Sequence, residues 1–206
     1  MNILILGATG RVGHEILNRA LNDGHNVTIL VRDKEKVTTE HKQLNIIQGN
    51  VLNKSDIEQA VRGNKAIISA LGTDGHTTLT EAMPLIIEAM EQEGIQRIVT
   101  IGTAGILQSR TDRNLLRYQS NESKRKTTRA AEEHHKVYEL LNKSSLNWTI
   151  VCPTYLPDGE RVGEYRVEQH YLPEDAVKIS VPDTADFAYS QLSSNKYNQS
   201  RVGIAY

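Results

Sequence analysis

The sequence has little of several residue types: it holds one cysteine, Cys152, one tryptophan and one phenylalanine among 206 residues. A single cysteine excludes an internal disulfide framework and a thiolate-rich metal site, and it fits a reducing compartment, so we expect a cytoplasmic protein. Long apolar runs are also missing. The longest near the N-terminus spans residues 3–6, far short of the roughly 18 residues that a membrane span needs. The sequence therefore predicts neither a signal peptide nor a membrane anchor.

Charge of one sign is not in excess either. Lysine plus arginine number 24 against 25 for aspartate plus glutamate, which gives a formal net charge of -1. Such a balance provides no overall field for nucleic acid or an anionic membrane, and we expect neither as a partner. The length suits one domain with a sizeable core and excludes two independent catalytic domains. A small-molecule partner must therefore be argued from a local site.

Short apolar runs alternate with longer amphipathic stretches, at a spacing of one strand plus one helix. This rhythm predicts an α/β fold built on a doubly wound parallel sheet. The runs are near-continuous Ile, Leu and Val, which is typical of strands buried on both faces. We expect strands at Asn2–Leu6, Asn26–Val31, Leu44–Gln48, 66–71, Arg97–Ile101 and 148–152, and a last strand near 201–205.

Helical patterns lie between these strands. We expect helices at Arg11–Asn22, at 56–62 with Ser55 as N-cap, at 85–93 opened by Pro84, and at 128–142. The segment 108–127 is polar and rich in Arg and Lys, and it is expected to be irregular. We expect a single domain over residues 1–206, with a dinucleotide-binding core at about 1–152 and a small substrate lobe plus the last strand at about 153–206.

A glycine-rich turn follows the first expected strand and precedes the first expected helix, with the sequence Gly7-Ala8-Thr9-Gly10-Arg11-Val12-Gly13. Glycines at this point allow a tight turn and a close approach of the backbone to a diphosphate, and the helix N-terminus adds N–H donors. The spacing is Gly-x-x-Gly-x-x-Gly rather than Gly-x-Gly-x-x-Gly. A purely structural turn is the alternative. We predict cofactor contacts from Gly7, Thr9, Gly10, Arg11, Val12 and Gly13.

The residues after the second expected strand indicate which dinucleotide binds. An arginine there accepts the 2′-phosphate of NADP, whereas an acid holds the ribose hydroxyl of NAD. Arg32 follows Val31 and favours NADP, while Asp33 leaves NAD open. Lys34 and Lys36 add positive charge nearby. The alternative is a solvated charge pair at the start of a short helix.

The chain resembles the atypical short-chain dehydrogenase/reductases, specifically the NAD(P)-binding, NmrA-like group that includes biliverdin-IXβ and flavin reductases. The resemblance covers nearly the whole chain, and it implies a Rossmann-like fold with a small C-terminal substrate lobe. No segment after the glycine-rich turn is decisive alone. The matching segments are 7–13, Val31-Arg32-Asp33, Gln48-Gly49-Asn50-Val51, Ser69-Ala70-Leu71-Gly72, Ile101-Gly102-Thr103-Ala104, 148–153 and 183–187.

This resemblance also implies roles for single residues. Asn50 and Val51 would bracket the adenine, with Asn in place of the family's Asp. Ala70, Leu71 and Gly72 would lie along the cofactor near its ribose. Thr103 and Pro153 would border the nicotinamide, and His135 would act as a proton donor, so that Thr103 and His135 are the candidate catalytic residues. Ordinary strand-end packing for Thr103 and Pro153, and a solvated helix face for His135, are the alternatives.

The sequence lacks the Tyr-x-x-x-Lys pair of ordinary short-chain dehydrogenases, because none of its eight tyrosines lies four residues before a lysine. In that pair the lysine lowers the pKa of the tyrosine, which then exchanges a proton with an alcohol. Without it we expect an NADPH-dependent oxidoreductase that passes a hydride to a flavin-, quinone- or tetrapyrrole-like acceptor. A non-catalytic NADP(H)-binding sensor acting through a protein partner is the alternative. An epimerase or dehydratase for nucleotide sugars is a weaker one.

Other reactive groups have simpler interpretations. His134 and His135 are adjacent, so on a helix they point about 100° apart and cannot share a metal ion; we expect no metal site. Cys152 is interpreted as a small packed residue. A basic concentration either surrounds an anionic ligand or is solvated; it comprises residues 124–126 together with Arg110, Arg113, Arg117 and Arg129.

Overall fold

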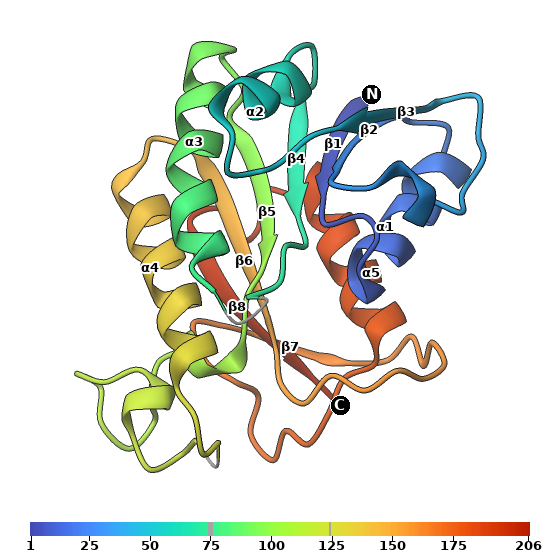
Figure 1. Cartoon of the computed structure of the whole chain (residues 1–206). Helices are drawn as coiled ribbons and strands as arrows, with labels where there is room; N and C mark the ends of the chain where they lie inside the picture. The colour runs from blue at the N-terminus through green and yellow to red at the C-terminus, as the bar shows by residue number, and fades with distance from the viewer. Residues whose placement is uncertain (74–75, 124) are drawn as a thin grey trace.

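The computed structural model in Figure 1 describes residues 1–73, 76–123 and 125–206, which form one eight-stranded sheet covered by helices. The strand order is β3-β2-β1-β4-β5-β6-β8-β7, and all neighbouring pairs are parallel except β7 with β8. This architecture confirms the predicted Rossmann-like α/β fold. The strands are β1 Asn2–Leu6, β2 Asn26–Val31, β3 Leu44–Gln48, β4 Ala66–Ser69, β5 Arg97–Ile101, β6 Asn147–Pro153, β7 Arg166–Gln169 and β8 Ser200–Ala205.

Helices cover both faces of the sheet, so the inner strands are buried on both sides. Side chains alternate along a strand: Leu4 and Leu6 of β1 pack in the core beneath α2, α3 and α4, and Ile3 and Ile5 pack in the core beneath α1 and α5 (Figure 1). The helices are α1 Arg11–Asn22, α2 Lys54–Val61, α3 Thr78–Gln92, α4 Arg129–Lys143 and α5 Val181–Ser190. None of the described helices is long and apolar enough to cross a membrane.

The segment after β6 adds one helix and two strands to the same sheet. β8 pairs with β6, and β7 forms the outer edge. The sequence predicted β8 but not β7 or α5. The side chain of Ser180 caps α5 by accepting the N–H of Asp183, and Phe187 packs in the core under α1. The domain boundary near residue 152, and the use of the following residues as a substrate lobe, stay predictions.

Two expected helix starts are wrong. α3 begins at Thr78, so Pro84 lies inside the helix instead of opening it. A proline there forfeits one backbone hydrogen bond, but Met83 and Ile86 on the same helix are buried in the core, and this burial outweighs the loss. α2 is capped by Asn53 rather than Ser55, because the Asn53 side chain accepts the N–H groups of Ser55 and Asp56.

The described part of segment 108–127 is irregular, as expected, apart from one short 3-10 turn, η3 Arg117–Gln119. A similar turn, η2 Ala104–Ile106, precedes the segment directly after β5. An isolated bridge pairs Gln108 with Leu116, and Ser109 is fully buried. The segment therefore folds back on itself beside the N-terminal end of α4.

Candidate functional site

The glycine-rich turn is shaped by steric necessity. Gly7 has φ 78°, and a Cβ there would lie 2.5 Å from the Ala70 carbonyl oxygen, while a Cβ at Gly13 would lie 2.1 Å from the Gly7 carbonyl oxygen. Larger residues would push the turn away from β4 and from α1. The N-cap of α1, Gly10, offers no side-chain acceptor, so the N–H groups of the first helical turn are left to bind an anion.

A cavity of about 280 Å³ opens beside this turn. It lies at the carboxyl ends of β1, β2 and β4, where the strand order reverses, and ligands of doubly wound sheets bind at such a point. Nine of the predicted cofactor residues line it: Gly7, Thr9, Gly10, Arg32, Asn50, Val51, Ala70, Leu71 and Gly72. The size and lining of this cavity fit the adenosine half of a dinucleotide.

Further cavity residues were not identified as contacts from the sequence: Leu30, Val31, Gly49, Leu52 and Thr78. Gly49 could have been predicted from the sequence, because it lies next to Asn50 in one of the segments that resemble the family. A Cβ there would lie 2.8 Å from the Asp56 carboxylate. That carboxylate accepts the N–H of Asn50 at 2.8 Å. The oxygen of the Asn50 side chain accepts the N–H of Leu52, so its NH₂ group remains available as a hydrogen-bond donor.

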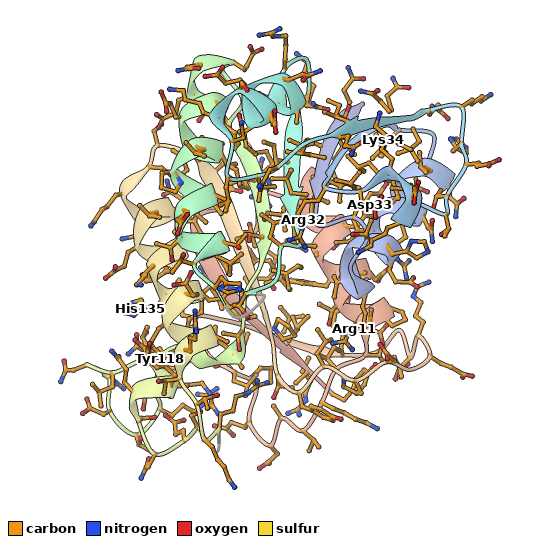
Figure 2. All side chains as sticks on the ribbon, viewed as in Figure 1. Arg11, Arg32, Asp33, Lys34, Tyr118 and His135 are labelled. Carbon is orange, nitrogen blue, oxygen red and sulfur yellow. The ribbon has the colours of Figure 1, made fainter. Side chains whose placement is uncertain are left out.

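Arg32 and Asp33 differ in what their side chains contact. The Asp33 carboxylate accepts the N–H of Glu35 and caps the short turn η1 Lys34–Lys36. The Arg32 side chain lines the cavity and has no ion-pair partner among the described residues. Figure 2 shows Arg32 near the middle of the molecule, with Asp33 and Lys34 on the side toward η1.

A second cavity of about 130 Å³ adjoins the first, and Thr9 lines both. Its polar lining consists of hydroxyl, ammonium and imidazole groups, without a carboxylate. The polar residues are Thr9, His14, Lys36, Thr38 and Thr39. A lining rich in hydrogen-bond donors favours an anion. Lys36 was named from the sequence as added positive charge, whereas His14 and the two threonines after Val37 were missed.

Three predicted cofactor residues in the last part of the glycine-rich turn, and Pro153, do not line either cavity. Val12 and Gly13 are buried in the first turn of α1. The Arg11 guanidinium extends elsewhere: Nη1 donates to the Leu156 carbonyl oxygen at 3.2 Å and to Asp158 Oδ1 at 2.9 Å. Pro153 is buried at the end of β6. These residues can contribute backbone groups or a wall, but their contact with a cofactor stays a prediction.

The two candidate catalytic residues lie on different elements. The Thr103 hydroxyl oxygen accepts the N–H of Gly105 at 3.4 Å, next to η2. His135 lies on α4, where its Nδ1 is 2.9 Å from the Tyr118 hydroxyl and its ring stacks on Tyr138. Figure 2 shows the Tyr118 and His135 pair at the outer side of α4, away from Arg32. Neither candidate lines the two cavities, and their catalytic roles stay predictions.

Tyr118 was missed from the sequence because it pairs with His135 across 17 residues inside an irregular segment. Burial raises the pKa of Tyr118, and the negative charge of Glu132 raises it further. The phenol is thus protonated at neutral pH, and its oxygen is hydrogen-bonded to His135 Nδ1. This hydrogen bond joins η3 to α4.

The shifted pKa values of His134 and Cys152 keep both side chains uncharged at neutral pH. Burial lowers the pKa of His134 to about 4, so its ring is neutral at pH 7. Burial raises the pKa of the Cys152 thiol to about 12, and a thiol that stays protonated is no nucleophile. The buried, protonated thiol agrees with the interpretation of Cys152 as a packed residue. Within the described residues, no three His, Cys, Asp or Glu side chains gather to hold a metal ion.

The basic concentration around residues 110–129 is partly neutralised by ion pairs. Arg110 pairs with Glu168 at 2.5 Å, and Arg117 pairs with Glu122 at 2.9 Å. Lys124 lies outside the described residues. Arg110 and Arg117 thus serve the packing of an irregular chain, which weakens the idea that these two residues bind an anionic ligand.

A family model for NAD(P)H-binding proteins matches residues 7–195, which is most of the chain. The protein belongs to this NAD(P)H-binding family. The match confirms a nicotinamide dinucleotide as its cofactor class, and it includes both cavities. Among curated relatives, the uncharacterized protein YwnB of Bacillus subtilis (strain 168) is 28% identical over 199 residues, covering 93% of this chain and 91% of its own.

Solved structures of the NAD(P)H-binding fold give two useful comparisons. A proposed NADH-flavin reductase from Streptococcus pneumoniae TIGR4 is 25% identical with a TM-score of 0.83, over 100% of this chain and 99% of its own. A proposed epimerase from Bacteroides thetaiotaomicron is 28% identical with a TM-score of 0.86, over 100% of this chain and 96% of its own. Because one fold accommodates both descriptions, the reaction must be argued from the site.

Proposed function

We propose that this protein is an NADPH-dependent oxidoreductase that transfers a hydride to a flavin-, quinone- or tetrapyrrole-like acceptor. The observation that carries the proposal is a dinucleotide cavity with a free arginine at its edge in a chain without a Tyr/Lys pair. The nicotinamide supplies the hydride when the cofactor is bound. The protein positions the cofactor and shields it from water.

The preference for NADPH is supported by the charges around the adenosine end. Arg32 lines the larger cavity, and Lys36 lines the smaller one beside it. Between them, Thr9 belongs to both cavities and offers a hydroxyl. Asp33, the residue that would favour NAD, caps η1 instead. A 2′-phosphate at this place would meet two cations and several donors, which are the partners that bind phosphate strongly.

The absence of the tyrosine acid of a Tyr-x-x-x-Lys pair supports the choice of a conjugated acceptor. Four residues before Lys136 and Lys143 on α4, the chain has Glu132 and Glu139 in place of tyrosine. A delocalised acceptor takes a hydride without a strong acid, and Thr103 and His135 are proposed to assist the later protonation. The likeness to a proposed NADH-flavin reductase supports a flavin. An epimerase would need the acid and base that this chain lacks.

The test is steady-state oxidation of NADPH and NADH with a panel of free flavins, quinones and linear tetrapyrroles. We expect at least one acceptor class to accelerate NADPH oxidation above the rate measured without protein, with NADH clearly poorer. Each acceptor without protein and each cofactor without acceptor serve as controls. Tight NADPH binding with no acceleration by any acceptor would overturn the proposed reaction and favour the cofactor-binding sensor.

A further inference from the structure

The chain between β6 and β7, residues 154–165, forms a strap that is tied down at both ends. Near its start, the carbonyl oxygens of Tyr155 and Pro157 accept the N–H groups of Ile179 and Val181. Near its far end, the Asp183 carboxylate accepts the N–H groups of Val162 at 2.9 Å and Gly163 at 3.0 Å. The strap has no helix or ladder of its own, so these ties fix its position.

The centre of the strap is held by a residue of the glycine-rich turn. Arg11, the first residue of α1, donates to the carbonyl oxygen of Leu156 and forms an ion pair with Asp158. Figure 2 shows Arg11 at the start of α1, directed toward the strap. The cofactor-binding turn and the segment that follows β6 are therefore joined by one guanidinium.

That guanidinium has a second place to bind when a dinucleotide is present. The diphosphate of a dinucleotide lies at the N-terminus of the first helix, and side chains of a helix point back toward its N-terminus. Arg11 at the first helical position is thus within its own side-chain reach of that diphosphate. Phosphate oxygens bind a guanidinium in charge-assisted, bidentate fashion.

We propose that Arg11 exchanges Asp158 for the cofactor's diphosphate, so that Asp158 competes with the cofactor and dinucleotide binding frees the centre of the strap. This inference rests on the dinucleotide binding of the proposed function, but not on any acceptor. Asp158 is thereby a residue that sets cofactor affinity without touching the cofactor. The strap carries two of the exposed large apolar residues, Tyr155 and Val162, so the exchange links the cofactor to a surface that an apolar acceptor can contact.

Arg11 can leave Asp158 at a small cost in free energy, because the ion pair between them is weak. The side chains of Arg11 and Asp158 are 57% and 81% exposed, and ion pairs in such positions contribute little stability. Asp158 returns to water when it is released, so no buried charge is left behind. The diphosphate offers Arg11 more negative charge than one carboxylate does, in a place already surrounded by backbone N–H donors.

The test measures NADPH affinity by calorimetry for wild type, Asp158→Asn, Arg11→Ala and the double variant. Loss of the competing charge should tighten NADPH binding about twofold to fivefold, the range of an exposed ion pair. Arg11→Ala should weaken binding, and in its background Asp158→Asn should have no effect. Glu160→Gln is the matched control, because Glu160 is an exposed strap residue without an ion pair among the described residues.

Hydrogen exchange gives a readout that is independent of affinity. NADPH should speed the exchange of the amides whose hydrogen bonds flank the strap's centre, Val162 and Val181, in the wild type, and these amides should exchange fast in Asp158→Asn with or without NADPH. Unchanged or weaker NADPH binding by Asp158→Asn, or the same gain in the Arg11→Ala background, would overturn the proposal alone. A wild type that binds neither NADPH nor NADH would overturn it together with the proposed function.

Discussion

Arg32 and Asp33 are neighbours in sequence, but only Arg32 lines the larger cavity. The Asp33 carboxylate is occupied by the N–H of Glu35, and Arg32 lines the cavity. Sequence alone left NADP and NAD both open here, because an acid and a cation stood side by side. The hydrogen bond that engages Asp33 is local, yet it depends on the chain turning into η1, which a single sequence does not show.

We expect Arg32→Ala to weaken NADPH binding by about 1.5–3 kcal/mol and to leave NADH binding nearly unchanged, because only NADPH loses a charge-assisted hydrogen bond to its phosphate. Calorimetric titration of both cofactors measures the two effects. Lys34→Ala is the matched control, since Lys34 is a cation two residues after Arg32 that lines neither cavity. Equal losses for NADPH and NADH would show that Arg32 does not contact the 2′-phosphate.

Whole elements followed from the sequence where burial on two faces imposes a continuous apolar run. β1 and β2 match their expected bounds, and β4 ends two residues early because Ala70 and Leu71 turn out to line the cavity. β7 has no such run: it is an edge strand of four residues with two exposed positions. α5 was missed because its buried residues include Asp183 and Thr184, polar types that a periodicity search does not count as core.

The start of α3 shows tertiary burial overriding a local rule. Pro84 is exposed and removes the bond that a residue at this position would donate to the Thr80 carbonyl oxygen. We expect Pro84→Ala to raise the free energy of unfolding by about 1–2 kcal/mol, since alanine restores that bond and has the highest helix propensity. Urea denaturation measures the change. Glu91→Ala, an exposed substitution later in α3, should stay within about 0.5 kcal/mol, and a destabilised Pro84→Ala would contradict the argument.

At the scale of the whole molecule, one carboxylate joins the strap, α5 and the end of the chain. Asp183 is fully buried. It accepts hydrogen bonds from the N–H groups of Val162 and Gly163, from the Ser180 hydroxyl and from the Tyr206 hydroxyl. Ser180 lies only three positions before Asp183, but the contacts with Val162, Gly163 and Tyr206 do not follow from sequence patterns, because they join residues 20 to 23 positions apart. The contacts of Arg11 with Asp158 and of Tyr118 with His135 could not be predicted from the sequence for the same reason.

The protonation of Asp183 should therefore govern part of the stability in acid. Burial by itself would raise the pKa of this carboxyl, but the hydrogen bonds from Tyr206, Val162, Gly163 and Ser180 outweigh burial and lower the pKa below its ordinary value. A group with a lowered folded pKa stabilises the protein fully above its unfolded pKa, about 3.9, and loses this contribution as the pH falls through the folded pKa.

We expect Asp183→Asn to lower the free energy of unfolding by about 2–4 kcal/mol at pH 7, because an amide presents an N–H group to donors that need an acceptor. The difference from wild type should shrink as the pH falls below about 4, since the wild-type carboxyl is then protonated and also loses acceptor capacity. Urea denaturation at a series of pH values measures this. Glu164→Gln, an exposed change at the end of the strap, should have little effect at any pH. A difference for Asp183→Asn that stays constant into acid would mean that the variant loses packing rather than a buried charge that holds the strap, α5 and Tyr206 together.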